Sequence, residues 1–417
     1  MSEALRQALA RVATKLGAAD AEFVLERPKD AGHGDMATNL AMVLARVQKA
    51  PPRAVAARII EALDLPQGVI EKTEIAGPGF INFWLATDEL AAALRGIVEA
   101  GPRYGRHDFG RGVRVNVEFV SANPTGPLHV GHGRGGALGD GIAALLEWTG
   151  HQLTREFYIN DAGVQIDRVG LSLWARVQEA VGRPFAIPEG GYHGEYLRED
   201  AVRGLEREGR GFADLPEEEG VRRCRALALV IQREEQDRDL ASFGVRYDVM
   251  TSEQAIYDRG AIPATLALLA SRGLTFERDG ALWLRTTDFG DDQDRVLRKS
   301  DGSYTYFLPD IAYHVDKHDR GFDRVIDVWG ADHHGYVPRV RAALRALGYP
   351  DDFFHVTVVQ LVKVLRGGDE VKMSKRSGEF VTLRDLVDEV GPDAARYFFL
   401  MRRGDSQLNF DLDLAKS

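Results

Sequence analysis

Residues 113–159 read VRVNVEFVSANPTGPLHVGHGRGGALGDGIAALLEWTGHQLTREFYI and carry the clearest fold signal of the chain. Apolar and polar side chains alternate over residues 113–119, which is typical of a β-strand. A turn rich in Pro and Gly follows at 124–127, and then a helix of small and apolar residues over about 132–148. Residues 153–159 return to the strand pattern. This strand–helix–strand unit predicts an α/β fold built on a doubly wound, parallel, Rossmann-like sheet.

The sequence on either side of this unit predicts other arrangements of helices and strands. Helical spacing over residues 3–16, 36–48 and 53–63, followed by a strand at 80–84, predicts a small α+β domain before it. Further strand patterns occur at 281–285, 324–329 and 354–359. The predicted organisation is an N-terminal α+β domain at 1–108, a catalytic domain at 109–370 with a helical insertion at about 166–260, and a C-terminal segment at 371–417.

The composition is that of an ordinary globular protein. Of 417 residues, 44% are hydrophobic and 28% charged, and 53 basic against 63 acidic side chains give a net charge of −10. No apolar run approaches the ~18 residues that a membrane span needs. The single cysteine, Cys224, excludes an intrachain disulfide and a zinc site built on several cysteines, which favours the reducing cytoplasm. The acidic balance argues against indiscriminate coating of nucleic acid but allows a local basic path for RNA.

The first chemical motif is His129-Val130-Gly131-His132, where the first strand of the unit gives way to the helix. Open α/β sheets bind ligands at this edge, and a helix N-terminus favours phosphate. Two imidazoles three residues apart can face a triphosphate together, and Gly131 lets the backbone come close. We therefore predict that His129 and His132 stabilise charge on ATP phosphates during the reaction. The alternative is a simple turn with two surface histidines.

The second motif is VKMSKRSG at residues 371–378. Lys372 and Lys375 flank Ser374, and two mobile ammonium groups suit the β- and γ-phosphate oxygens of ATP. A string of this kind by itself is usually a solvated surface loop. Its position downstream of the two histidines makes the pair of motifs specific.

Taken together, the two motifs resemble the HIGH and KMSKS signatures of the class I aminoacyl-tRNA synthetases, which match residues 129–132 and 372–375. The amino-acid sequence around the two motifs resembles that of arginyl-tRNA synthetases over nearly the whole chain. The stretches that carry this finer resemblance are 33–39, 118–127, 158–165, 304–312 and 329–335.

The resemblance implies which residues hold the substrates. Carboxylates and polar groups suit the planar fork of a guanidinium, and the expected arginine contacts are Glu118, Ser121, Asn123, Tyr306, Asp310 and His334. The expected ATP contacts are His129, Gly131, His132, Gly330, Asp332, Lys372, Met373, Ser374 and Lys375, among which the two histidines and two lysines are expected to be catalytic. His334 stands where some family members carry Gln, so it matches in location but not in residue type.

Simpler structural roles stay open for several of these side chains. Asp310 follows Pro309 and fits a helix N-cap, and Glu118 fits a strand carboxylate paired with a nearby Arg. His333 and His334 fit a metal site, but no third ligand stands at a suitable spacing. We therefore predict no metal ligands and no structural zinc.

The function implied by the resemblance is arginine–tRNA ligation. ATP, bound as its Mg²⁺ complex, activates L-arginine to arginyl-adenylate, and the terminal adenosine of tRNA(Arg) takes the arginyl group. We expect a cytoplasmic monomer with no membrane partner. The resemblance also implies an anticodon-binding domain that residues 1–417 do not supply.

Two other functions stay open. One is a truncated or non-catalytic relative that binds ATP, arginine or partners without charging tRNA. The other is a small-molecule nucleotidyltransferase with an HxGH site. Such an enzyme should lack both the N-terminal domain and the sequence motif around Asp310.

Overall fold

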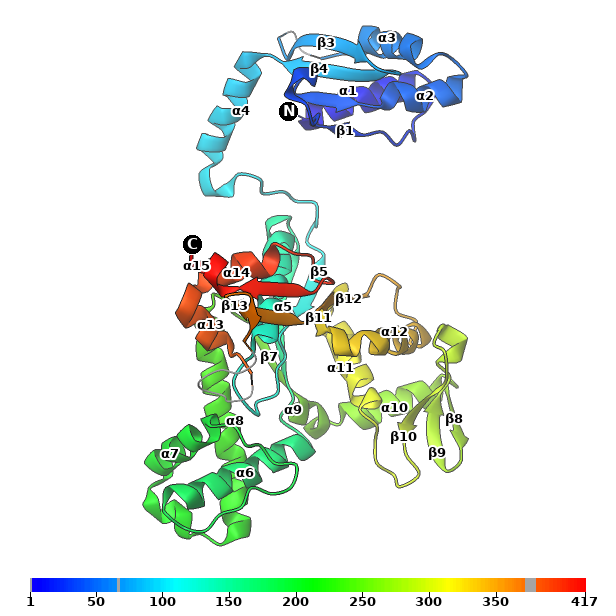
Figure 1. The fold of residues 1–417 in the computed structure, drawn as a ribbon. Coiled ribbons are helices and arrows are strands. Elements are labelled where there is room, and N and C mark those ends of the chain that lie inside the picture. Colours follow the sequence, from blue (N-terminus) through cyan, green and yellow to red (C-terminus); the bar gives the residue numbers. More distant parts are fainter. Residues whose placement is uncertain (1, 66–67, 372–379) are drawn as a thin grey trace. The chain divides into compact units, whose positions relative to one another are not determined.

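A computed structural model describes residues 2–65, 68–371 and 380–417 of the chain. The chain divides into two compact units, Met1–Gly105 and Arg106–Ser417 (Figure 1). Among the described residues, no helix combines the length and the apolar composition that crossing a bilayer requires.

The first unit is an antiparallel sheet packed against helices. The strand order is β1 (Leu25–Glu26), β2 (Met36–Thr38), β4 (Phe80–Leu85) and β3 (Ile70–Ala76). The helices are α1 (Ser2–Lys15), α2 (Leu40–Gln48), α3 (Pro52–Ala62) and α4 (Thr87–Ala100), with short 3₁₀ turns η1 (Ala31–His33) and η2 (Gly101–Arg103). Leu9, Leu44, Ile59 and Phe83 are fully buried in its core, so this unit has an apolar interior of its own.

The prediction of one continuous helix over 36–48 is wrong at its start. Residues 36–38 form strand β2, which pairs with β1 and β4, and α2 begins only at Leu40. The Thr38 hydroxyl donates to the Val24 carbonyl at 2.7 Å, and the Val24 N–H donates to the Asn39 side chain at 2.8 Å. Pairing with neighbouring strands therefore outweighs a helical spacing that is visible only locally.

The second unit is built on a parallel sheet, which confirms the predicted fold class. The strand order is β12 (Phe354–Val359), β11 (Arg324–Gly330), β5 (Arg114–Glu118), β6 (Gln152–Ile159) and β7 (Val249–Ser252), and every pair is parallel. Helix α5 (Val130–Trp148) connects β5 to β6. Two separate apolar clusters adjoin the sheet, one including α5 and the other α11 and α12, as expected for a doubly wound sheet.

Close packing of α5 on the sheet depends on its glycines. A Cβ at Gly139 would lie 2.2 Å from the ring of Phe119, which follows β5 and is fully buried. Real side-chain atoms do not approach this closely, so the small residues of the α5 sequence let the helix sit directly on the aromatic side chain.

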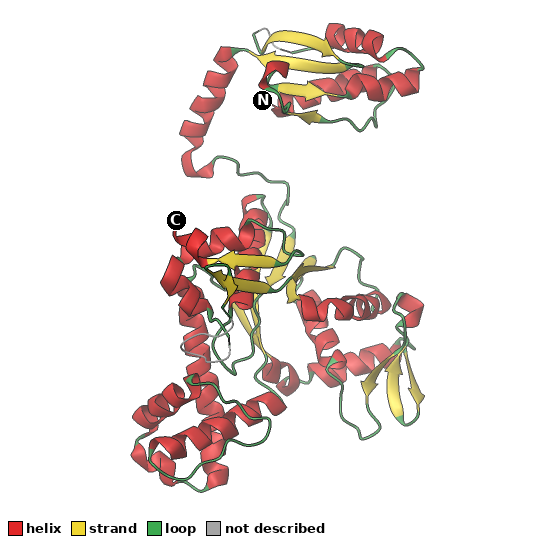
Figure 2. Ribbon diagram, in the orientation of Figure 1, coloured by secondary structure: helices red, strands yellow, loops and turns green. Residues whose placement is uncertain are grey.

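A helical insertion separates β6 from β7. It consists of α6 (Val164–Ala180), α7 (Tyr196–Glu208), η3 (Arg210–Asp214) and α8 (Glu217–Ser242), at the bottom of the ribbon in Figure 2. Trp174, Leu197, Phe212, Cys224 and Ile231 form its separate core. The lone cysteine is therefore a buried packing residue, and burial raises the pKa of its thiol to about 12.

A second excursion lies between β7 and β11 and is partly sheet. It contains α9 (Glu253–Asp258), α10 (Ala261–Ser271), η4 (Thr287–Phe289), α11 (Phe307–Asp319) and an antiparallel sheet in the order β10 (Arg295–Arg298), β9 (Ala281–Leu284), β8 (Thr275–Arg278). After β11 come η5 (Ala331–Tyr336) and α12 (Val337–Ala346). Helix α11 lies beside the centre of the parallel sheet, since its Lys317 contacts Glu118 of β5 and Asp327 of β11.

The described residues of 362–417 form another small sheet with helices, so this part of the fold begins before the C-terminal segment predicted at 371–417. Its strand order is β14 (Asp369–Glu370), β13 (Val362–Arg366), β15 (Leu408–Asp411), and its helices are α13 (Leu383–Val390), α14 (Pro392–Leu400) and α15 (Leu412–Lys416). Arg134 of α5 anchors this segment: its guanidinium donates to the carbonyls of Gln360, Arg403 and Ser406 at 2.8–2.9 Å. The Arg134 side chain is only 1% exposed, so this contact is internal.

Candidate active site

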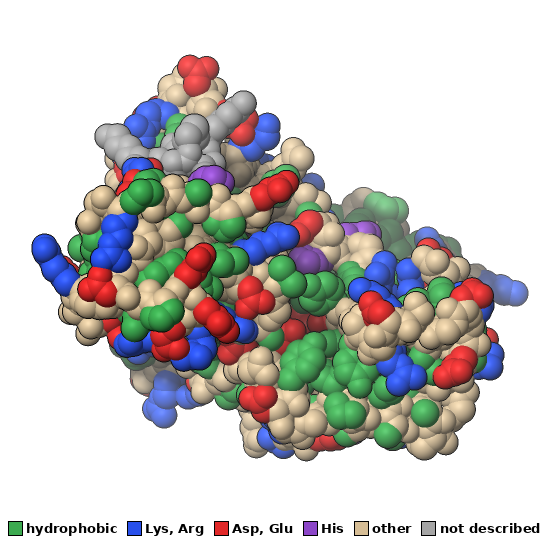
Figure 3. All heavy atoms as spheres, turned by 90° about the horizontal axis from the view of Figure 1, so that it is seen from below, with side chains coloured by type: hydrophobic (Ala, Val, Ile, Leu, Met, Phe, Trp, Pro, Cys, Tyr) green, Lys and Arg blue, Asp and Glu red, His purple; other side chains and the backbone are tan. Residues whose placement is uncertain are grey.

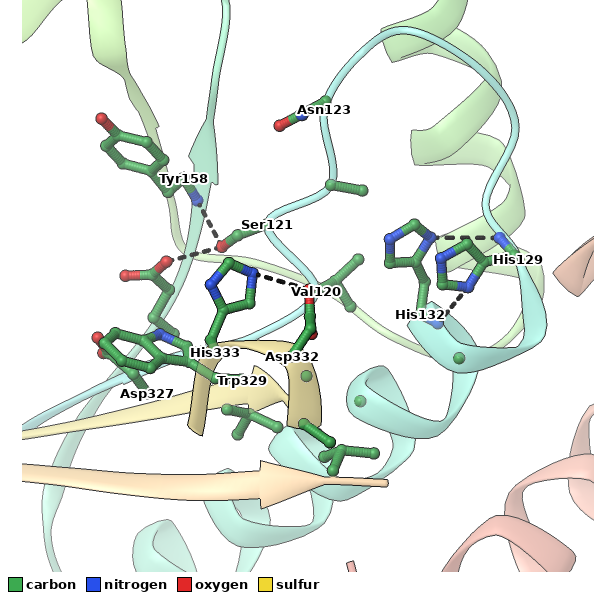
Figure 4. A pocket seen from close by; sticks show the side chains of 18 of the residues that line it. Val120, Ser121, Asn123, His129, His132, Tyr158, Asp327, Trp329, Asp332 and His333 are labelled. Carbon is green, nitrogen blue, oxygen red and sulfur yellow. Dashed lines mark hydrogen bonds and ion pairs between the residues drawn. The ribbon is translucent and has the colours of Figure 1, made fainter. Parts of the chain in front are cut away.

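A cavity of about 820 Å³ opens at the carboxyl ends of β5 and β11. The loop after β5, the start of α5, one side of α11 and the turn η5 line it. Figure 4 shows His129 and His132 on one side of this cavity and Ser121, Tyr158 and Asp327 on the other. Ligands of open parallel sheets bind at this edge, so its location agrees with the strand–helix–strand unit seen in the sequence.

Most of the sequence-predicted site residues that the structure describes converge here. The cavity is lined by Glu118, Ser121, Asn123, His129, Gly131, His132, Asp310, Gly330 and Asp332. Lys372, Met373, Ser374 and Lys375 lie outside the described residues.

Two predicted arginine contacts do not line the described cavity. Tyr306 is the N-cap of α11 and is 77% exposed, one turn before Asp310. His334 is exposed on η5, and the cavity wall at this point is its neighbour His333. A helical turn such as η5 points successive side chains in different directions, so one position decides which imidazole faces the cavity.

His129 and His132 cap the N-terminus of α5 reciprocally. The backbone N–H of each residue donates to Nδ1 of the other at 3.2 Å, and the two rings stack with centroids 3.6 Å apart. A neutral imidazole whose Nδ1 accepts must carry its proton on Nε2. Burial lowers the pKa of both rings, so both are neutral near pH 7 and each offers one Nε2–H donor.

Gly131 is required by this arrangement. A Cβ at position 131 would lie 2.9 Å from Cε1 of His129, because the ring folds back over the first turn of the helix. The glycine of the motif therefore leaves space for a side chain as well as for a ligand.

The loop after β5 holds two residues in the left-handed region. Val120 has φ 69° and Ser121 φ 41°, and a β-branched residue there is strained. The Ser121 hydroxyl donates to Glu118 Oε1 at 2.9 Å and accepts from the Tyr158 N–H at 3.1 Å (Figure 4). The strained backbone thus delivers Ser121 to the carboxylate at the end of β5.

The helical insertion holds the rest of this loop. The buried Gln236 amide donates to the carbonyls of Asn123 and Gly126 at 3.0 and 3.1 Å. The Tyr196 hydroxyl donates to the Thr125 carbonyl at 2.6 Å. The loop conformation therefore depends on a segment that is distant in sequence.

Glu118 is paired with a lysine, not with the arginine that the sequence left open. The buried Lys317 ammonium donates to Glu118 Oε2 at 2.6 Å and to Asp327 Oδ1 at 2.9 Å. Burial raises the pKa of Glu118, and the Lys317 charge opposes this rise. Burial would lower the pKa of Lys317, but Asp327 and Glu118 raise it above its ordinary value.

Asp310 is not a helix cap, because α11 begins at Phe307 with Tyr306 as its N-cap. Burial raises the pKa of Asp310 to about 6, against the opposing effect of the Tyr336 hydroxyl. Nearby Glu253 is also buried, and burial together with the Asp310 charge raises its pKa to about 7. Desolvated carboxylates that repel one another favour a bound cation, which would relieve both their burial and their mutual repulsion.

Sequence reasoning missed the polar groups behind these carboxylates. Asp310, His314 and Lys317 stand at i, i+4 and i+7 on α11, so they share one face of a helix whose other buried residues are mostly apolar. That polar stripe was the available signal. Asp327, between apolar residues of β11, gave a second one.

Gly330 and Asp332 form the edge of the cavity at the end of β11. A Cβ at Gly330 would lie 2.5 Å from Asp332 Oδ1, so the glycine lets this carboxylate fold back toward the strand. The Asp332 side chain is 80% exposed and approaches His333 Nε2 at 3.3 Å. Within the described part of the chain, no three His, Cys, Asp or Glu side chains are arranged to hold a metal ion.

Two family descriptions match the sequence. "Arginyl tRNA synthetase N terminal domain" matches residues 1–85, and "tRNA synthetases class I (R), catalytic domain" matches residues 103–399. The chain belongs to the arginyl-tRNA synthetase family. The class I catalytic region of arginyl-tRNA synthetases therefore contains the parallel sheet and the cavity, and the N-terminal region falls within the first compact unit.

Relatives from several bacteria agree with this assignment. The arginine–tRNA ligase of Syntrophotalea carbinolica is 54% identical over 95% of this chain and 71% of its own length. That of Bacillus licheniformis is 49% identical over 100% of this chain and 76% of its own length. The solved Thermus thermophilus arginyl-tRNA synthetase shares the fold, with a TM-score of 0.72 at 24% identity over 100% of this chain and 78% of that one.

Proposed function

We propose that the cavity activates L-arginine with ATP and passes the arginyl group to tRNA(Arg). The observation that carries this proposal is the polarity of one cavity: neutral imidazole donors at one end and buried carboxylates at the other. Its volume of about 820 Å³ suits two small substrates side by side. The histidine end can bind the phosphates of ATP, and the carboxylate end can bind the cationic side chain of arginine. The two substrates would then lie next to each other in one cavity.

The histidine end holds the nucleotide. The two Nε2–H donors at the start of α5 face phosphate oxygens, and Gly330 and Asp332 face the ribose. Burying a neutral imidazole costs less free energy than burying a charged one. Its N–H donor can therefore be held in position for the negative charge that develops in the transition state. Lys372 and Lys375 add positive charge at the β- and γ-phosphates.

Arginine lies at the carboxylate end. Its guanidinium faces Asp310 and Glu118, and Ser121 and Asn123 contact its polar backbone groups. Analogues without the positive fork leave these desolvated carboxylates unpaired, which supplies strong discrimination without an editing site. Tyr306 and His334 remain proposed arginine contacts, reached by closure of the exposed start of α11 and of η5 onto the substrate.

The reaction needs no covalent nucleophile from the protein. The arginine carboxylate attacks the α-phosphorus in line, pyrophosphate leaves, and the 2′-hydroxyl of the terminal adenosine of tRNA then displaces AMP from the adenylate. Positioning and electrostatics supply the acceleration. Mg²⁺ enters with ATP as part of the substrate and neutralises phosphate charge.

The two alternative functions are not favoured. A small-molecule nucleotidyltransferase would lack the N-terminal region matched at residues 1–85. A non-catalytic relative does not fit with arginine–tRNA ligases about 50% identical over the whole chain. We propose a monomer that works in the cytoplasm, in keeping with the single buried cysteine.

In this proposal, tRNA(Arg) contacts a few local surfaces of the protein and not its whole surface. On the face drawn in Figure 3, basic and acidic side chains are interspersed rather than gathered into one basic patch. An overall charge of −10 is compatible with such local contacts.

The proposal is tested with the 417-residue chain, ATP, radiolabelled pyrophosphate and tRNA(Arg). We expect pyrophosphate exchange that depends on L-arginine and is absent with citrulline, the neutral isostere of arginine. Exchange with citrulline equal to that with arginine, or no exchange with either in the presence of tRNA(Arg), would overturn it.

A further inference from the structure

A continuous chain of buried polar contacts lies behind the carboxylate end of the cavity. It runs from the Asp310 carbonyl to His314 Nδ1 (2.7 Å), from His314 Nε2 to Asp327 (3.1 Å), and from Asp327 through Lys317 to Glu118. Glu118 then continues the chain to Ser121. The chain therefore joins Glu118 of β5, a predicted arginine contact, to Asp327 of β11 and to the main chain of α11 at Asp310.

Lys317 occupies the centre of this chain without reaching the cavity. Its side chain is 0% exposed and is absent from the described cavity lining, whereas Glu118 and Asp327 both line it. The ammonium also lies 4.3 Å from the ring centroid of Tyr313, which closes its remaining side. Lys317 acts on whatever the cavity binds only through the carboxylates that it holds.

The carboxylates of Glu118 and Asp327 share the Lys317 ammonium, and Asp327 also contacts His314 Nε2 at 3.1 Å. Neighbouring Glu156 contacts Arg320 at 2.8–2.9 Å. Lys317 is therefore the group that holds the Glu118 and Asp327 carboxylates beside each other at the cavity. Without the ammonium, two adjacent buried carboxylates would repel each other, and one would take up a proton or turn away.

We propose that Lys317 is a positioning residue for the amino acid, fixing the Glu118 carboxylate in the orientation that receives the guanidinium. This inference rests on the proposed function, because it takes arginine as the occupant of the carboxylate end. It predicts that loss of the ammonium weakens arginine binding selectively, since the described hydrogen bonds of Lys317 go to Glu118 and Asp327 and to none of the predicted ATP contacts.

The test is Lys317→Met, which keeps the length of the side chain and removes its charge. We expect the Kd for arginine, measured by calorimetry, to rise roughly tenfold or more. The Kd for ATP and the kcat at saturating arginine should stay within about twofold to threefold, because they do not depend on Glu118. Lys299→Met removes the same charge at an exposed position and should leave arginine binding unchanged.

A double-mutant cycle with Glu118→Gln keeps the inference testable if Lys317→Met alone folds poorly. The double variant removes the ammonium and the Glu118 charge together, so it does not leave two unpaired carboxylates side by side. If Lys317 acts through Glu118, adding Lys317→Met to Glu118→Gln should weaken arginine binding by less than about threefold.

Two results would overturn the inference. One is arginine affinity in Lys317→Met equal to that of the parent protein. The other is equal loss of arginine and ATP affinity together with a lower melting temperature, which indicates a purely structural role. A parent protein that binds arginine no better than citrulline would instead refute the proposed function.

Discussion

The backbone N–H of His129 donates to His132 Nδ1, and the backbone N–H of His132 donates to His129 Nδ1, both at 3.2 Å. The two side chains therefore replace the Ser or Asp and the Glu that usually cap a helix in this reciprocal way. The same bonds leave both Nε2–H groups free for a ligand. Structure at the start of α5 and chemistry in the cavity are thus two uses of the same imidazoles.

Replacing His132 by Ala should reduce arginine-dependent pyrophosphate exchange by roughly 10²- to 10³-fold, because one donor to the transition state is lost. Arginine binding, measured by calorimetry, should be nearly unaffected. His129→Asn is the informative companion, since Asn caps helices well but is too short to replace Nε2–H. It should retain the melting temperature and still lose exchange. Unaltered exchange in His132→Ala would remove the histidines from the mechanism.

Arginine binding should weaken as the pH falls through about 6. The pKa of Asp310 is raised to about 6 by burial, so below this pH the carboxyl is neutral and its attraction for the guanidinium is lost. The KM for arginine, measured from pH 5 to 8, should rise on the acidic side. Asp310→Asn should show a high KM with a flatter profile.

Burial and the Asp310 charge raise the pKa of Glu253 to about 7, so Glu253 titrates in the same range. Glu253→Gln run in parallel separates the two groups. If the acidic limb persists in Asp310→Asn and vanishes in Glu253→Gln, the limb belongs to Glu253.

Much of this fold could be predicted because its signals are local. Strands β5 and β6 and the helix between them follow from alternation and helical spacing, and the chemistry of residues 129–132 follows from four adjacent residues. The carboxylate end was only partly accessible. Lys317 and Glu118 are 199 residues apart in sequence, and nothing near either one indicates the other. Long-range pairing of this kind depends on how α11 docks on the sheet.

The conformation of the loop after β5 could not be predicted from the sequence either. Val120 is a poor candidate for a left-handed conformation on any local scale, and the contacts of Ser121, Gln236 and Tyr196 with distant parts of the chain hold the loop in place. Functional sites are where local preference and observed structure are expected to disagree.

Gly139→Ala should destabilise the second unit by about 1–3 kcal/mol or more, because the new Cβ would lie 2.2 Å from the Phe119 ring. Gly141→Ala is the matched control on the same helix. Its nearest neighbour would be a Leu400 methyl at 3.9 Å, so we expect stabilisation of about 0.5–1 kcal/mol. Urea unfolding of both variants measures the difference. Equal effects would mean that α5 does not sit on Phe119 as closely as described.

Stability should fall as the pH rises from about 4 to 7 through Asp200. This carboxyl is fully buried in the helical insertion, where it accepts from Gln232, and burial raises its pKa to about 7. The folded state then holds a proton that the unfolded chain has released, so each step up in pH favours unfolding, by at most about 4 kcal/mol in total.

Asp200→Asn should therefore melt higher than the parent protein at pH 8, with a smaller difference at pH 4. The exposed neighbour Glu199→Gln is the control and should leave the pH dependence of melting intact. A parent protein that is equally stable at both pH values would contradict this account.

The first unit offers a test of tRNA contact. Lys49 and Arg53 flank the turn between α2 and α3, and Arg53 also donates to the Gly77 carbonyl at 2.7 Å. Reversing both charges to Glu should raise the KM for tRNA(Arg) several-fold at low salt and leave the KM for ATP unchanged. An unchanged KM for tRNA would show that these residues serve only solubility.

The Arg134 contacts have a consequence for sequence variation. Among the described residues, the guanidinium donates to main-chain carbonyls alone, those of residues 360, 403 and 406, which lie before and after the second motif. A carbonyl is the same group in every amino acid, so the side chains at these three positions can change without altering the contact. Arg134 itself has no such freedom, since no other side chain presents several donors in a planar fork. One fixed arginine thus ties the helix that begins with the histidines to both arms of the segment that carries the lysines, and leaves the sequence of those arms free to drift.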